Sequence, residues 1–330
     1  MRAFLTVVLL GALALEANPA LARRRPPPSP TPQPTAPAVA PPAATPPSQA
    51  VRLQRMRAKL GEIARAAPGR LGIAVYDLAT DERFAIRGDE AFPLASVYKI
   101  ALGVTAYRLA DQKRLALDER VVVTRGDLRR GVSDIARDHP AGGVSLPYWQ
   151  LVRAMLVTSD NTASDLVLRA VGGPAAVQRT LERLHLRGFT IRKSEAELAT
   201  DARQQRSFAR GGDNGGTPSA LADLLVGLAT QRFTLLDSTY ELVNDLSDVA
   251  TGMGRLRAGL PATVRLAHKT GTSATFDGAT DATNDAGLVT LPDGRRIAVV
   301  ALLAESHADE ATRDATLAQV ARAVAEAYAP

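Results

Sequence analysis

Residues 286–303 read AGLVTLPDGRRIAVVALL. The apolar runs 286–290 and 297–303 are typical of strands, and Asp293-Gly294 between them favours the tight turn of a β-hairpin. A third strand-like run, residues 264–268, precedes this pair. The C-terminal part of the chain is therefore expected to build most of a β-sheet.

The other end of the chain carries strands that can complete this sheet. Residues 71–78 and 83–86 read as a second strand pair, turned at Thr80-Asp81. Neither end alone has enough strands for a stable sheet, so we expect both ends to share one. Apolar residues at helical spacing predict a helix outside each set of strands: Leu53, Met56, Leu60 and Ile63 near the start, and Leu317, Val320, Val324 and Tyr328 near the end.

Between the two sets of strands the pattern is helical. Helices are predicted over residues 96–109, 146–157, 161–171, 174–185 and 218–230. The sequence thus predicts an α/β fold, in which an antiparallel sheet of N- and C-terminal strands is flanked by terminal helices and carries an inserted all-helical subdomain. The α/β part is expected over residues 51–95 and 252–330, and the helical part over residues 96–251.

The first fifty residues have a different composition. Arg2, the apolar stretch 4–15 and Ala20-Leu21-Ala22 form the pattern of a secretory signal peptide, expected over residues 1–22. Residues 23–50 hold 11 of the 21 prolines, which is typical of a disordered linker. We therefore expect an exported protein, periplasmic or secreted, that keeps no membrane span once the signal is cleaved.

Composition excludes several classes of function. The chain has no cysteine, which rules out thiolate nucleophiles and cysteine-bound zinc, and none of its four histidines lies in an H-E-x-x-H motif. Aromatic residues are only 4%, and the net charge of +6 is not concentrated in a basic stripe. A nucleic-acid binder usually has both features, so we expect neither nucleic acid nor a metal as a partner.

Ser96 and Lys99 form an S-x-x-K motif at the start of the apolar helix 96–109. A spacing of three places both side chains on one helix face. A serine at a helix N-terminus suits a nucleophile, and a partly desolvated lysine can lose its proton and act as a base. The alternative is a capping serine with a surface lysine, but Lys99 lies between the apolar Val97 and Ile100.

Two further motifs follow at long range. Ser159-Asp160-Asn161 opens a helix, where it suits N-capping and also offers a hydroxyl for proton transfer and an amide for substrate contact. Lys269-Thr270-Gly271 ends a strand, with a positive charge beside a glycine that lets a ligand approach the strand edge. Each motif alone has a purely structural interpretation, but the three in this order are a rare combination.

S-x-x-K, S-D-N and K-T-G are the motif set of class A β-lactamases and penicillin-binding proteins. The chain resembles the class A serine β-lactamases over residues 51–330, including residues 283–285 after the K-T-G strand. This resemblance implies a monomeric enzyme that opens the ring of a small-molecule β-lactam and needs no cofactor.

The resemblance also implies roles for individual residues. Ser96 would be the nucleophile and Ser159 a proton donor. Glu195 stands 36 residues beyond Ser159, where the family has its Ω-loop, and would activate water to release the acyl-enzyme, with Glu197 as the second acid of the loop. The base in acylation would be either Lys99 or Glu195 acting through water. Backbone N–H groups of Ser96 and Thr272 would form the oxyanion hole, and the substrate would be held by Asn161, Lys269, Thr270, Thr272 and Arg255, whose guanidinium suits bidentate contact with a carboxylate.

Two positions depart from the family pattern. Ala199 stands where the family often has an asparagine that helps to hold the hydrolytic water, and Ala196 replaces the usual proline after the glutamate. Both bear on deacylation more than on acylation. A penicillin-binding D,D-peptidase with slow deacylation therefore stays an alternative, as does a non-catalytic peptidoglycan-binding domain of the same fold. A Ser-His-Asp hydrolase is disfavoured because the chain has no G-x-S-x-G.

Overall fold

The structure is a computed structural model that describes residues 48–198 and 212–328. The expected signal peptide, residues 1–22, and nearly all of the expected linker, residues 23–50, lie outside the described residues, as does Ala199. Within the described ranges, no helix combines the length and the apolar character needed to cross a bilayer.

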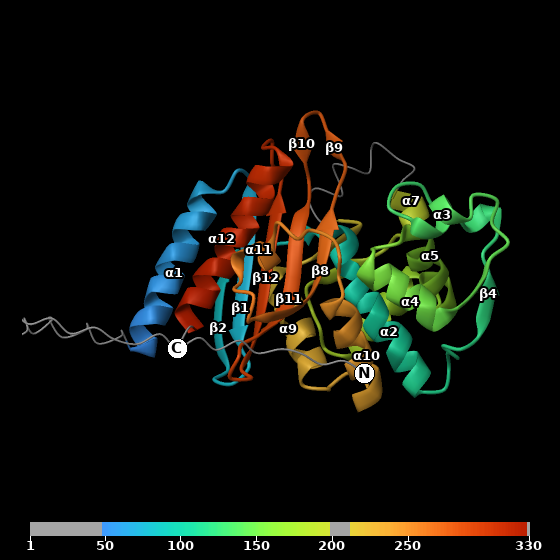
Figure 1. Cartoon of the computed structure of the whole chain (residues 1–330), viewed down its shortest axis with the longest axis horizontal. Helices are drawn as coiled ribbons and strands as arrows, with labels where there is room; N and C mark the ends of the chain where they lie inside the picture. Colours follow the sequence, from blue (N-terminus) through green and yellow to red (C-terminus); the bar gives the residue numbers. More distant parts are fainter. Residues whose placement is uncertain (1–47, 199–211, 329–330) are drawn as a thin grey trace, which may run out of the picture. The chain divides into compact units, whose positions relative to one another are not determined.

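Five antiparallel strands form the central sheet, in the order β2-β1-β12-β11-β8 (Figure 1). Their bounds are β1 Arg70–Asp77, β2 Glu82–Ile86, β8 Arg265–Thr272, β11 Thr283–Thr290 and β12 Arg296–Ala304. β1 pairs with β12 along its whole length, from Arg70 opposite Ala304 to Asp77 opposite Ile297. The prediction that both ends of the chain share one sheet is confirmed.

Side chains that alternate along these strands cover both faces of the sheet. On β1, Leu71, Ile73 and Val75 belong to the hydrophobic cluster that includes α1 and α12, whereas Ala74 and Tyr76 belong to the cluster on the other face. Each of these five residues is at most 8% exposed. Burial on both faces fixes the register, because a slip by one residue would exchange the faces.

The terminal helices α1 (Gln49–Ala66) and α12 (Glu310–Tyr328) lie side by side over one face of the sheet (Figure 1). α1 begins two residues before Val51, the expected start of the folded part, with Ser48 as its N-cap. On the other face, α9 (Pro218–Ala229) contacts β1 and β12. The sheet is thus the middle layer of three, and the predicted flanking helices are confirmed.

Helices fill most of the chain between β2 and β8. Besides α9, the α-helices are α2 Lys99–Asp111, α3 Asp134–Asp138, α4 Tyr148–Val157, α5 Asn161–Ala170, α6 Pro174–Arg183, α7 Glu195–Leu198, α10 Leu236–Ser247 and α11 Leu256–Gly259, and the 3-10 helices are η1 Ala95–Tyr98 and η2 Arg125–Asp127. The helices predicted from apolar periodicity are all present, with ends that differ by a few residues.

The prediction that the inserted part is all-helical needs a correction, because it also contains short strands. β4 (Arg120–Val122) pairs with β5 (Ser145–Pro147). β6 (Phe189–Ile191) and β7 (Asn214–Gly216) form a small sheet with β3 (Phe92–Pro93). Strands of two or three residues are too short to show a periodic pattern in the sequence. The same holds for the hairpin of β9 (Thr275–Phe276) and β10 (Ala279–Thr280) beyond β8.

Candidate active site

Ser96 lies where the edge strand β8 meets η1, half-buried in the second position of that short helix. Ala95 before it has φ +46°, a left-handed conformation that is uncommon for a residue other than glycine. A Cβ added to Gly271 would lie 2.6 Å from Leu94 O and 3.1 Å from Ser96 N. The glycine of K-T-G is therefore required for β8 to approach the serine of S-x-x-K.

Asn284 on β11 holds the segment before Ser96 by two hydrogen bonds. Its Nδ2 donates to Pro93 O (2.7 Å) and Leu94 O (3.2 Å), and the residue is buried. Two backbone carbonyls that precede the turn are thereby tied to the central sheet. The position of Ser96 thus depends on the sheet as well as on its own helix.

Lys99 is the centre of the polar cluster beside Ser96. The residue has no solvent exposure, and its Nζ donates to Ser159 O (2.9 Å) and Asn161 Oδ1 (2.7 Å) and lies 3.4 Å from Ser159 Oγ. Glu195 Oε1 lies 3.4 Å from the same nitrogen. The structure therefore brings the S-D-N motif and the segment of Glu195 to the lysine of S-x-x-K.

The S-D-N segment presents its outer residues to Lys99 and uses its middle residue for structure. Ser159 has φ +63°, so the backbone turns sharply before α5. The fully buried Asp160 caps α5 by accepting from Ala163 N (2.8 Å), and it also accepts from Ile135 N (2.9 Å) and Ser133 Oγ (3.0 Å). These bonds to two helix starts hold the turn that directs its neighbours toward Lys99.

Glu195 is the first residue of α7 and is mostly shielded from water, with its side chain 14% exposed. Its Oε1 accepts from the Tyr98 hydroxyl at 3.1 Å, in addition to facing Lys99. Its backbone N donates to Asp165 Oδ1 (2.8 Å), and Ala196 N donates to Asp165 Oδ2 (3.0 Å). The carboxylate of Asp165 therefore holds the start of α7 against α5.

Glu197, the second acid of this loop, has a different environment. It accepts from Ser194 N and Ser194 Oγ, both at 2.8 Å. These two hydrogen bonds lower the pKa of Glu197 below the usual value for a glutamate. Glu197 thus caps its own short helix, while Glu195 faces the buried cluster.

Lys269 brings a second buried ammonium to the site from β8. It has no solvent exposure, and its Nζ donates to Thr270 O at 3.0 Å. Burial, and then repulsion from Lys99, lowers the pKa of Lys269 well below the usual value for a lysine. The Thr270 hydroxyl is hydrogen-bonded to that of Thr251.

Arg255 supports the edge of β8 from behind. The residue is 3% exposed; its Nε donates to Asp314 Oδ1 (2.8 Å), its Nη1 to Gly271 O and Asn284 O (3.1 Å each), and its Nη2 to Thr272 Oγ1 (2.7 Å). Four N–H groups of the guanidinium are thus used within the protein. Among the described residues, one N–H of Nη2 has no partner. The expected contact of Arg255 with a substrate carboxylate stays a prediction.

Thr272 is exposed at the end of β8. The direction of its backbone N–H follows from its neighbour in the strand. Ser273 N donates to Ala282 O, on the β11 side of the strand. Because N–H groups alternate in direction along a strand, Thr272 N points the other way. β8 is the edge strand, and its Gly271 lies against Ser96 N.

Sequence reasoning missed Tyr98 and Asp165, which contact Glu195, and their own partners Ser164 and Arg129. Arg129 Nε lies 2.5 Å from Asp165 Oδ2, and so completes the support of α7. Ser164 and Asp165 stand three and four residues after Asn161, on the same face of α5. The sequence shows only that both residues are polar, and their burial is known from the structure alone.

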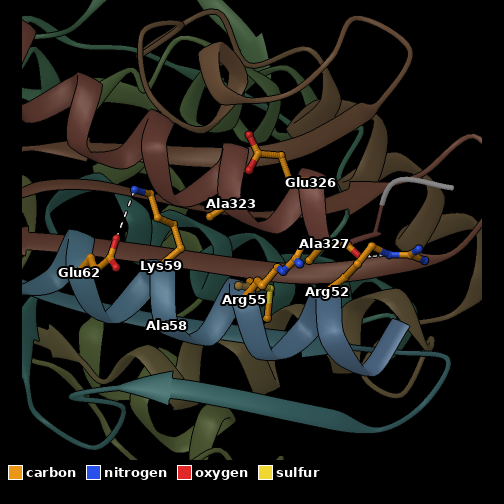
Figure 2. Close-up of a pocket in the computed structure, with 9 residues that line it drawn as sticks. Arg52, Arg55, Ala58, Lys59, Glu62, Ala323, Glu326 and Ala327 are labelled. Carbon is orange, nitrogen blue, oxygen red and sulfur yellow. Dashed lines mark hydrogen bonds and ion pairs between the residues drawn. The ribbon is translucent and has the colours of Figure 1, made fainter. Parts of the chain in front are cut away.

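A hollow of about 480 Å³ lies elsewhere, between α1 and α12 (Figure 2). Arg52, Arg55, Lys59 and Glu62 line it from α1, and Lys59 pairs with Glu62 at 3.3 Å. None of its lining residues belongs to the cluster around Lys99. Nowhere in the described part of the chain do three or more acidic or histidine side chains form a group that could hold a metal ion.

Comparisons with known proteins agree with this arrangement. The family model described as "Beta-lactamase enzyme family" matches residues 55–328. Extended-spectrum beta-lactamase PER-1 of Pseudomonas aeruginosa is 32% identical, over 76% of this chain and 80% of its own length. Beta-lactamase L2 of Stenotrophomonas maltophilia is 34% identical, over 78% of this chain and 81% of its own length.

Solved structures give the same result. A beta-lactamase from Chitinophaga pinensis has a TM-score of 0.77 and 32% identity, covering 82% of this chain and 98% of its own. An ancestral class A beta-lactamase has a TM-score of 0.73 and 35% identity, covering 83% of this chain and 100% of its own. The chain therefore belongs to the beta-lactamase enzyme family, as a class A serine β-lactamase.

Proposed function

We propose that this enzyme hydrolyses the β-lactam ring of penicillins and cephalosporins through an acyl-enzyme on Ser96, which water activated by Glu195 then releases. The observation that carries the proposal is the position of Glu195. Its Oε1 lies 3.4 Å from Lys99 Nζ, and its side chain is only 14% exposed. A carboxylate that faces the lysine of S-x-x-K, rather than bulk solvent, is placed to act as a general base.

In acylation, Ser96 Oγ attacks the carbonyl carbon of the lactam, and its proton passes to Lys99 Nζ or, through water, to Glu195. The ring C–N bond then breaks, and Ser159 Oγ passes a proton to the leaving nitrogen. Lys99 Nζ lies 3.4 Å from Ser159 Oγ, which supports this proton return. The products of this step are an ester on Ser96 and an opened ring.

In deacylation, Glu195 takes a proton from water while the water oxygen attacks the ester carbon. The tetrahedral intermediate collapses, the bond to Ser96 Oγ breaks, and Ser96 Oγ takes up the proton that Glu195 removed from water. Backbone N–H groups of Ser96 and Thr272 would stabilise the oxyanion in both steps. One such donor typically contributes about 10²–10³ in rate.

The substrate carboxylate is proposed to bind near the end of β8. Lys269 supplies positive charge, Thr270 and Thr272 supply hydroxyls, and Arg255 holds the Thr272 hydroxyl through Nη2. The Asn161 side chain gives its oxygen to Lys99, which leaves its N–H groups for the amide of the substrate side chain. Arg255 thus acts through Thr272 and contributes one further N–H at most.

Hydrolysis of a chromogenic cephalosporin, with penicillin labelling followed by intact mass, tests the nucleophile. The enzyme is expected to hydrolyse the cephalosporin, and Ser96→Ala is expected to lose both turnover and every covalent adduct. An adduct that persists in Ser96→Ala would place the nucleophile elsewhere. A long-lived adduct on the unsubstituted enzyme, without turnover, would instead indicate a D,D-peptidase-like protein.

We also propose that the enzyme is exported, that residues 1–22 are cleaved as a signal peptide, and that the mature protein works as a monomer. Residues 23–50 would be a Pro-rich linker that precedes a catalytic domain over residues 51–330. The apolar stretch 4–15 and the small residues at 20–22 support cleavage. N-terminal sequencing of protein recovered outside the cytoplasm should begin at Arg23. A start at Met1 would refute the cleavage, and a dimer in light scattering would refute the monomer.

A further inference from the structure

Tyr98 stands between Ser96 and Lys99 in the S-x-x-K motif, and its side chain is buried, with the residue 1% exposed. Its hydroxyl donates to Glu195 Oε1 at 3.1 Å and lies 2.9 Å from Ser164 Oγ. Ser164 is fully buried on α5. The tyrosine hydroxyl therefore connects the helix that follows S-D-N to the carboxylate on α7.

The chemistry of the three groups fixes the direction of these hydrogen bonds. An ionised carboxylate only accepts, so Tyr98 donates its one proton to Glu195 and accepts from the Ser164 hydroxyl. Burial, and then the charge of Glu195, raises the pKa of Tyr98 well above its usual value, so the phenol keeps its proton. In such a chain each hydrogen bond polarises and strengthens the next.

Resting on the function proposed above, we propose that Tyr98, backed by Ser164, is a positioning residue for the general base, holding Glu195 Oε1 so that Oε2 meets the hydrolytic water. Tyr98 and Lys99 both contact Oε1. From the described ranges of the chain, Oε2 receives no hydrogen bond. Among the described residues, the carboxylate is thus held at Oε1 alone.

Several other charges surround Glu195. Lys99 faces it from α2, Lys269 from β8, and Asp165 from α5, where it is paired with Arg129. Glu197 lies on the same short helix but is held by Ser194. Removing the Tyr98 hydroxyl leaves all these charges in place. Only the hydroxyl that donates to Glu195 Oε1 is lost, and with it a hydrogen bond that favours the charged form of a carboxylate.

The test is Tyr98→Phe, which keeps the buried ring and removes only the hydroxyl. With a penicillin as substrate, kcat should fall about tenfold, acyl-enzyme should accumulate, and the acid limb of the kcat profile should move up by about one pH unit. The acylation rate should change less. Tyr107→Phe is the matched control, because it removes a hydroxyl from a 6%-exposed tyrosine on α2 outside the Lys99 cluster, and it should leave the profile unchanged.

Ser164→Ala keeps Tyr98 and removes only the outer donor, so it should shift the acid limb in the same direction by a smaller amount. If Tyr98→Phe does not fold, the acid limb of Ser164→Ala tests the proposal instead. An unchanged acid limb in the folded variants, or equal loss of acylation and deacylation rates, would overturn the proposal and leave Tyr98 a purely structural role.

A second measurement separates this inference from the proposed function. The carboxyl carbon of ¹³C-labelled Glu195 can be titrated by NMR, with Glu195→Gln to assign the signal, and the proton uptake should move to higher pH in Tyr98→Phe. If the unsubstituted enzyme turns over penicillin but the titration does not move, only the inference fails. If the unsubstituted enzyme forms no Ser96 adduct at all, the proposed function fails. The NMR titration then still tests the contact between Tyr98 and Glu195.

Discussion

The burial of Lys269 affects its charge, and through that charge the proposed binding of substrate. Its ammonium is fully buried, and burial together with Lys99 lowers its pKa well below that of an ordinary lysine. As the pH rises, Lys269 therefore loses its proton before a lysine in solution would. The charge proposed to attract the substrate carboxylate disappears with that proton.

This argument predicts an alkaline loss of kcat/KM for penicillins at a pH well below the usual lysine pKa of about 10.4. Lys269→Arg should move that loss to higher pH, because a guanidinium stays protonated. Initial rates across the alkaline range measure both profiles. Identical alkaline limbs in the two proteins would show that another group controls them. The control is Lys59→Arg, at an exposed lysine that pairs with Glu62, and it should leave the alkaline limb unchanged.

At the scale of elements, α7 has too few residues to hold itself in place. Four residues cannot stabilise an isolated helix, so its position depends on contacts outside it. Asp165 supplies them by accepting from Glu195 N and Ala196 N, and Arg129 holds the Asp165 carboxylate in turn. The position of Glu195, the proposed general base, is therefore set by α5.

Asp165→Ala should release α7 and leave the Arg129 guanidinium unpaired. Because hydrogen bonds to a charged group are worth about 1.5–3 kcal/mol, we expect a loss of kcat of about 10-fold to 100-fold. Hydrogen exchange should rise in peptides that cover residues 193–198 and stay unchanged in α1. Asp223→Asn, which breaks an exposed ion pair with Arg83, is the control. Unchanged exchange over α7 would contradict this role of Asp165.

The sequence was most informative about elements with long periodic patterns and about motifs with chemical meaning. Most strands and helices of eight or more residues were predicted, because their buried faces repeat at fixed spacing. The exception is α10, Leu236–Ser247, which was not predicted. The contacts of Tyr98 and Asp165 were not predicted, because a single polar side chain has no periodicity and its partner can lie anywhere in the chain. Arg255 was predicted at the site, but only the structure gives the partners of its N–H groups.

At the scale of the whole molecule, one sheet joins the two ends of the chain and supports the site at its edge. β12 is central, pairs with both β1 and β11, and is buried on both faces. β11 in turn carries Asn284, which holds the segment before Ser96. The stability of the fold and the placement of Ser96, the proposed nucleophile, therefore depend on the same strands.

Leu302 on β12 tests this dependence. It has no solvent exposure, so Leu302→Ala should lower the free energy of unfolding by about 2–5 kcal/mol, read from the midpoint of urea denaturation. Val122→Ala, at a residue that is 55% exposed, should have little effect. Equal midpoints for the two variants would contradict the assignment of β12 to the core.

The central claim, that Glu195 releases an ester formed on Ser96, is tested most directly by intact-mass spectrometry of Glu195→Gln at successive times after mixing with a penicillin. We expect the protein to gain the mass of one penicillin, with the adduct mapped to Ser96, and to keep it for many turnover times of the unsubstituted enzyme. A variant that shows no adduct and still hydrolyses the penicillin at the normal rate would contradict the account.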